Sequence, residues 1–111
     1  ESIKLYNHVQ NLTEFSSDFA SLGYSYLKIG NINKSIYIFT KLKESSILEE
    51  WRMKGQWYLL ITYLKAGNQK SIDFEYTLSN ALKIKYNNLA FQKRIYALKN
   101  EYYKLKTDNS H

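Results

Sequence analysis

The sequence lacks cysteine and proline, and it has only four glycines among its 111 residues. Without cysteine there is neither a disulfide framework nor a thiolate metal site, and the redox compartment stays undetermined. Without proline and with few glycines, long uninterrupted helices joined by tight turns are favoured over sheets with elaborate loops. A chain of this length forms one domain that buries roughly two-thirds of its unfolded surface, so it needs no covalent staple.

Long apolar runs are missing as well. The longest are short stretches such as residues 57–61, whereas a membrane-spanning helix needs about 20 apolar residues, so we expect no span in this segment. The chain begins at Glu1 and not at methionine, and we expect it to be a processed or excised piece of a longer protein. The compartment therefore stays open between the cytoplasm and the periplasm or envelope of a bacterium.

The net charge of +6 is unevenly distributed. Residues 83–111 contain seven Lys or Arg and two Asp or Glu, whereas residues 1–82 contain nine against eight. Such a basic segment is a solvated helix face, or it binds nucleic acid, acidic lipid or an acidic peptide. The candidate basic patch consists of Lys93, Arg94, Lys99, Lys104 and Lys106.

Residues 18–42 read as two amphipathic helices joined at Gly30 and Asn31. Gly30 can take the left-handed conformation that ends a helix, and Asn31 or Asn33 can cap the next one. The second helix carries Ile36, Phe39 and Leu42. Because a helical hairpin that is apolar on one side is unstable alone, we expect it to pack against a similar hairpin. The apolar stripe of its first helix consists of Phe15, Phe19, Leu22, Tyr26 and Ile29.

The chain repeats itself. Residues 26–36, YLKIGNINKSI, return as YLKAGNQKSI at residues 63–72, and Ser-Ile pairs begin at Ser2, Ser35 and Ser71. Their spacings of 33 and 36 residues lie close to a period of about 34 residues. We therefore expect the chain to start inside a repeat, with a loop at residues 11–14 and a helix cap at Thr13 or Ser16.

This pattern resembles the tetratricopeptide repeat (TPR) family. Leu22-Gly23, Tyr26 and Phe39 match the residues that the family prefers at their positions. Ser35 occupies the position of the family's small residue, where the two helices of a repeat cross. In the second repeat Leu59 and Tyr63 match. There Leu60 replaces the glycine and Ile72 the alanine, so we expect wider or re-angled packing.

The resemblance implies an all-α fold, in which TPR-like hairpins stack as a right-handed α-solenoid closed by a C-terminal capping helix. Residues 55–72 are similar to the penultimate hairpin of bacterial repeat proteins. In the capping helix Phe91, Ile95, Leu98, Tyr102 and Leu105 form the apolar stripe. The single domain 1–111 divides into the second helix of a partial repeat (1–12), two repeats (16–47 and 51–85), the capping helix (89–106) and a fraying tail (107–111).

Residues for catalysis are sparse. His8 and His111 lie at opposite ends of the chain, and the close carboxylates Glu49 with Glu50, and Asp73 with Glu75, point apart on a helix. There is no glycine-rich phosphate loop. We therefore predict a non-enzymatic protein without a metal site or cofactor.

The resemblance also implies a binding groove lined by the first helix of each repeat. Carried over to this chain, its candidates are Tyr24, Leu27, Lys28, Lys54, Trp57, Ile61 and Lys65, beside Ser17, Ala20 and Leu64. Ala20 and Tyr24 depart from the carboxylate-clamp form of the family. Most of the eleven tyrosines lie on or beside apolar stripes and are predicted to be core or groove aromatics.

The predicted function is non-catalytic binding of a protein peptide or partner helix in this groove. One alternative is binding of RNA or an anionic surface by the basic final helix. Another is a structural role, as a spacer or as a homodimer formed through an open repeat edge.

Overall fold

In the computed structural model every regular element is helical within the described residues, 2–46, 48–84 and 87–109. Between residues 2 and 14 the side chains of only Lys4 and Asn7 are described, and the side chain of Asn109 is not. The all-α prediction is confirmed for this part of the chain. The elements are α1 (Ser2–Lys28), α2 (Ile32–Ser45), α3 (Glu49–Ala66), the 3-10 turn η1 (Asn68–Lys70), α4 (Ser71–Lys83) and α5 (Leu89–Asn109).

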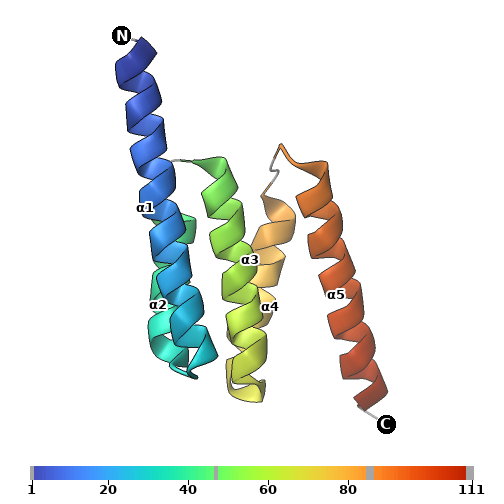
Figure 1. Cartoon of the computed structure of the whole chain (residues 1–111). Helices are drawn as coiled ribbons and strands as arrows, with labels where there is room; N and C mark the ends of the chain where they lie inside the picture. The colour runs from blue at the N-terminus through green and yellow to red at the C-terminus, as the bar shows by residue number, and fades with distance from the viewer. Residues whose placement is uncertain (1, 47, 85–86, 110–111) are drawn as a thin grey trace.

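The helices form two layers. Helices α1, α3 and α5 lie side by side in front, and α2 and α4 lie behind them (Figure 1). Consecutive helices run in opposite directions, so each hairpin contributes one helix to each layer. The resulting body measures 62 × 32 × 16 Å along its principal axes.

The predicted turn at Gly30 is confirmed, and Gly67 forms the equivalent turn in the repeated segment. Gly30 and Gly67 have φ angles of 83° and 84°, a region that glycine enters without the steric penalty of a Cβ atom. After Gly30, the side-chain oxygen of Asn31 accepts a hydrogen bond of 3.3 Å from the backbone N–H of Lys34, as an N-cap residue should.

The predicted loop at residues 11–14 is wrong, because α1 is one continuous helix of 27 residues. Thr13 and Ser16 are therefore interior positions and not caps, and residues 1–12 are not a separate helix of a partial repeat. The sequence from Ser2 to Leu22 contains neither glycine nor proline, so nothing in the backbone interrupts the helix. The N-terminal part of α1 extends beyond the other helices (Figure 1).

The C-terminal boundaries also differ from the predictions. Helix α4 ends at Lys83, and α5 begins at Leu89, where Asn88 Oδ1 accepts from the backbone N–H of Phe91 at 2.9 Å. Helix α5 continues to Asn109, so residues 107–109 do not form the predicted frayed tail. Residues 85 and 86 of the predicted turn, and residues 110 and 111 with His111, lie outside the described residues.

Helix α3 holds the core together because it contributes to both apolar clusters. One cluster joins it to the first hairpin, and the other joins it to α4 and α5. The first contains Ala20, Phe39, Leu42 and Leu59. The second contains Met53, Leu60, Phe74, Leu78, Ala81, Phe91 and Ile95. The apolar stripe predicted for the last helix is confirmed for Phe91, Ile95, Leu98 and Tyr102, whereas Leu105 is exposed.

Two glycines allow close helix contacts. A Cβ atom on Gly23 would lie 2.9 Å from the Phe39 ring, so α1 needs a residue without a side chain at this position. A Cβ atom on Gly55 would lie 2.7 Å from the backbone nitrogen of Lys43, so α2 and α3 cross there almost backbone to backbone. This role of Gly55 was not predicted from the sequence.

Ser35 and Thr62 form a buried polar pair between α2 and α3, with their hydroxyl oxygens 3.3 Å apart. The Thr62 hydroxyl donates to the Tyr58 carbonyl oxygen at 2.8 Å, so the Ser35 hydroxyl is the donor to Thr62. Ile72 does not take the corresponding place in α4, because its side chain is 81% exposed. The turn after Gly67 is one residue shorter than that after Gly30, and this shifts the phase of the helix.

The apolar stripe predicted for the first helix does not pack against another hairpin. Phe15, Leu22 and Ile29 are 67%, 46% and 75% exposed, and only Phe19 and Tyr26 are half-buried. Among the described side chains, the buried side of α1 is a neighbouring stripe at the same spacing, consisting of the small residues Ser16, Ala20 and Gly23 followed by Leu27. Small residues let α1 approach α2 closely, and the bulkier stripe is displaced to the outer edge.

Candidate protein-binding face

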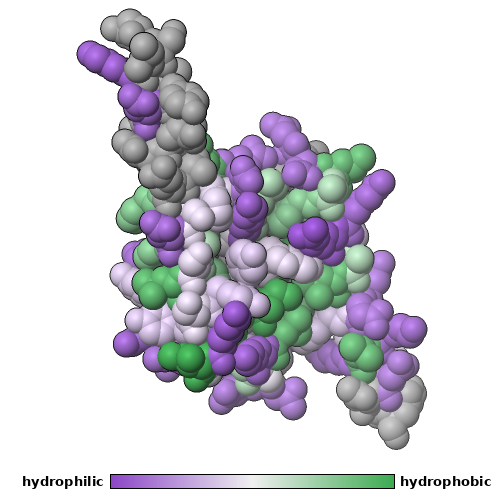
Figure 2. Space-filling view, in the orientation of Figure 1, coloured by the Kyte–Doolittle hydropathy of each residue, from purple (hydrophilic) through white to green (hydrophobic). Residues whose placement is uncertain are grey.

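The candidate site is the face formed by α1, α3 and α5. Tyr24, Lys28, Lys54 and Lys65 are exposed on these helices, and Trp57 and Ile61 are half-buried. Leu27 is only 4% exposed, so it belongs to the core and not to the groove floor as predicted. Figure 2 shows apolar surface over α3 and toward α5, with hydrophilic side chains around it.

The first group of side chains lies along the seam between α1 and α3. The Tyr24 and Tyr58 rings have centroids 6.3 Å apart, and the Lys28 ammonium lies 4.7 Å from the Tyr24 centroid. Lys65 Nζ donates to the carbonyl oxygen of Leu27 at 3.0 Å, close to the end of α1. The structure thus brings three predicted residues, Tyr24, Lys28 and Lys65, to one seam.

The second group lies along the seam between α3 and α5. The Arg94 guanidinium lies 5.2 Å from the Trp57 ring centroid, and Lys54 lies 4.3 Å from the Trp51 ring and 3.0 Å from a Glu50 oxygen. Arg94, Trp57, Lys54 and Glu50 line a hollow of about 390 Å³, and Trp51 does not. Its walls are Glu50, Met53, Lys54, Trp57, Asn88, Ala90, Phe91 and Arg94.

Sequence reasoning missed Tyr58 and assigned Arg94 to a different surface. Lys54, Tyr58, Ile61 and Lys65 are separated by four, three and four residues, which places them on one helix face, so a helical projection of residues 49–66 would have included Tyr58. Arg94 could not be assigned to the hollow in this way, because its contact with Trp57 depends on how α5 packs against α3.

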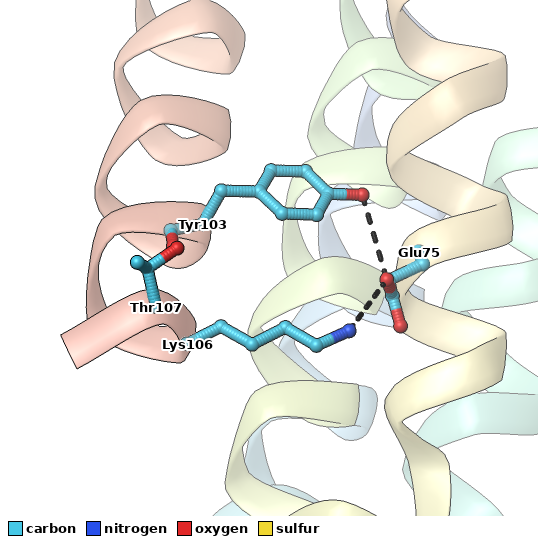
Figure 3. Close-up of polar contacts among 4 residues, drawn as sticks. All are labelled: Glu75, Tyr103, Lys106 and Thr107. Carbon is cyan, nitrogen blue, oxygen red and sulfur yellow. Dashed lines mark hydrogen bonds and ion pairs between the residues drawn. The ribbon is translucent and has the colours of Figure 1, made fainter. Parts of the chain in front are cut away.

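The basic residues of α5 do not form the single predicted patch. Arg94 faces α3, whereas Lys106 Nζ lies 3.2 Å from Glu75 Oε1 of α4, in the other layer (Figure 3). Lys99 is half-buried, and Lys93 and Lys104 are exposed. The basic charge is therefore divided between different sides of the helix.

Glu75 joins α4 to α5 through two side chains. The Tyr103 hydroxyl donates to the same Glu75 oxygen at 3.5 Å, and Thr107 Oγ1 donates to the Tyr103 carbonyl oxygen at 2.9 Å (Figure 3). The hydrogen bond to Glu75 and its negative charge raise the pKa of Lys106. Burial, and then the charge of Glu75, raise the pKa of Tyr102.

The described residues contain no cluster of three or more histidine, aspartate or glutamate side chains that could hold a metal ion. No helix among them combines the length and the apolar character that crossing a bilayer requires. The hollow at the α3–α5 seam combines aromatic rings with cationic groups, which can bind apolar side chains and carboxylates.

The chain matches no protein-family model, no curated protein and no solved structure.

Proposed function

We propose that this chain is a non-catalytic protein-binding module, and that its helices stack as a TPR-like, right-handed solenoid. Its ligand is a peptide or helix of a partner protein, held against the face of α1, α3 and α5. The self-similarity of residues 26–36 and 63–72, and the two-layer arrangement of the hairpins, support this architecture.

One observation supports the binding face most directly. Both seams of the front layer pair aromatic rings with cations: Lys28 with Tyr24 at the first, and Arg94 with Trp57 at the second. Aromatic side chains and arginine are enriched where proteins bind one another, because they bury a large area and keep a polar group. A segment that carries apolar and acidic side chains complements both seams.

The test uses a photoreactive phenylalanine analogue at Ile61, between the two seams, and a matched probe at Tyr76, which is exposed on α4. We expect the Ile61 probe to crosslink one protein from a bacterial lysate that the Tyr76 probe does not. Its affinity for the unlabelled chain is then measured by calorimetry. The double variant Lys28→Glu, Arg94→Glu should bind at least about tenfold more weakly, whereas Lys70→Glu, Lys104→Glu should not.

Circular dichroism spectra show whether the variants keep their helices. Equal affinity of both double variants would contradict the proposed face. The runner-up function, RNA or anionic-surface binding by α5, predicts a different result: the chain would retain nucleic acid, and binding would weaken steeply with added salt. The division of the basic residues of α5 between two sides makes that function the less favoured one.

A further inference from the structure

The outer edge of the first hairpin exposes more bulky apolar surface than its own chain covers. Phe15, Leu22 and Ile29 of the displaced stripe are exposed, and so is Tyr37 of α2 beside them. The Phe15 and Phe19 rings are stacked with centroids 5.8 Å apart. A contiguous apolar surface of this kind marks an interaction site in a folded protein.

This edge faces away from the proposed binding face. Tyr24 contacts Tyr58 of α3, and Leu22 lies two residues earlier, about 200° around the helix. Between α1 and α2 the edge contains a cleft of about 310 Å³. Its walls are Phe15, Ser16, Phe19, Tyr37, Lys41, Leu42, Ser45 and Ser46. A partner bound here would leave the α1–α3–α5 face open.

The length of α1 indicates what covers this edge. Phe15 lies at the middle of the 27-residue helix, and the exposed stripe occupies its C-terminal half. The N-terminal part of the α1 ribbon extends beyond the other helices (Figure 1). The sequence of the N-terminal half carries Leu5, Val9 and Leu12 at spacings of four and three, the pattern of a helix that pairs with another helix.

A second copy related by a two-fold axis near Phe15 would cover the N-terminal and the C-terminal half of α1 in one contact. Two antiparallel α1 helices would each place their N-terminal half along the stripe of the other copy, and the contact would be closed and symmetric. A helix face about 40 Å long and about 10 Å wide offers roughly 400 Å² per copy. With the contribution of Tyr37 and the α2 edge, the total area approaches the ~1,000 Å² of a specific interface.

The charge distribution favours a second copy at this edge and not at the other end. Residues 1–45 contain five basic and four acidic residues, so two such edges barely repel each other. Residues 83–111 contain seven basic and two acidic residues, and two copies of that segment would repel.

We propose that the outer edge of α1 and α2 is a self-association surface that binds a second copy of this chain in an antiparallel, two-fold arrangement. Sedimentation velocity of the whole chain between 1 and roughly 200 µM is expected to show a monomer–dimer equilibrium. The variant Phe15→Glu, Leu22→Glu should weaken association at least about a hundredfold. The control Ile72→Glu, Tyr76→Glu, at apolar positions of α4 that are more exposed than Phe15 and Leu22, should dimerise as the natural chain does.

Cysteine crosslinking tests the geometry without a disruptive substitution, since the chain has no cysteine of its own. Phe15→Cys lies near the proposed axis, so oxidation should link two copies through a disulfide. Tyr76→Cys should not be linked. A natural chain that stays monomeric throughout the concentration range overturns the proposal. So does a dimer that is linked through Tyr76→Cys and not through Phe15→Cys, or one that both double variants weaken equally.

Discussion

The two ends of the helical array carry apolar stripes with the same spacing, but one stripe is largely buried and the other is largely exposed. In α5, Phe91 and Ile95 are buried against α3 and α4, and lysines cover much of the outer surface. At the other end, Phe15 and Leu22 of α1, and Ile29 directly after it, are exposed. At the α5 end the largest apolar residues of the stripe face inward. The α1 end resembles an interior surface that has been left uncovered.

The difference shows what a four-and-three pattern measures. It identifies the apolar side of a helix, and it does not identify the neighbour that covers that side. In α1 two adjacent stripes have the same spacing, and the one with small residues is buried because it permits close packing with α2. The size of the side chains therefore determines which of the two stripes is buried.

The largest expected difference in the free energy of unfolding is between two isoleucine-to-alanine variants, one at each end of the array. Ile95→Ala should reduce the free energy of unfolding by about 2–5 kcal/mol, because the side chain is fully buried and a cavity remains. Ile29→Ala should change it by about 0.5 kcal/mol or less in the monomer. Urea unfolding at low protein concentration measures both. Equal losses would mean that the α1 edge is covered within the monomer.

The glycine crossings should give the next largest effect. Gly55→Ala should lower the free energy of unfolding by about 1–3 kcal/mol, since the new methyl group meets the Lys43 backbone, which side-chain rotation cannot relieve. Gly23→Ala should lower it less, because the Ile38 and Phe39 side chains it meets can shift. The exposed Ser79→Ala reports the gain in helix propensity alone. A more stable Gly55→Ala variant would contradict the close crossing.

The smallest expected effect is a loss of thermal stability at alkaline pH that depends on Tyr102 of α5. Tyr102 has a raised pKa in the folded protein, so the folded state holds the phenol proton more tightly than the unfolded state. Its contribution to stability is complete below about pH 10 and is lost as the pH rises through the higher, folded-state pKa. Tyr102→Phe should therefore lose less thermal stability between pH 9 and 11 than the natural chain. Identical losses, with matching stability at pH 7, would contradict the shift.

Much of the fold was predictable because local signals agreed with it. The turns at Gly30 and Gly67, and the inward positions Phe74, Leu78 and Ala81, follow from residue type and spacing alone. The loop at residues 11–14 was predicted from the repeat spacing. No glycine or proline is present there to end a helix, so α1 continues through these residues. The position of Leu27 in the core, and the contacts of Arg94 and Lys106 with different helices, depend on helix rotation, which a single sequence does not specify.

The buried hydroxyl pair of Ser35 and Thr62 sets the axial alignment of α2 against α3. Apolar ridges pack almost equally well after a slide of one helical turn, whereas a slide would separate the two hydroxyl groups and leave the Ser35 donor without its acceptor. An unsatisfied buried hydroxyl costs about 1–3 kcal/mol. Together with the close crossing at Gly55, this hydrogen bond between two small side chains fixes the vertical position of the first hairpin, and with it the height at which Tyr24 meets Tyr58.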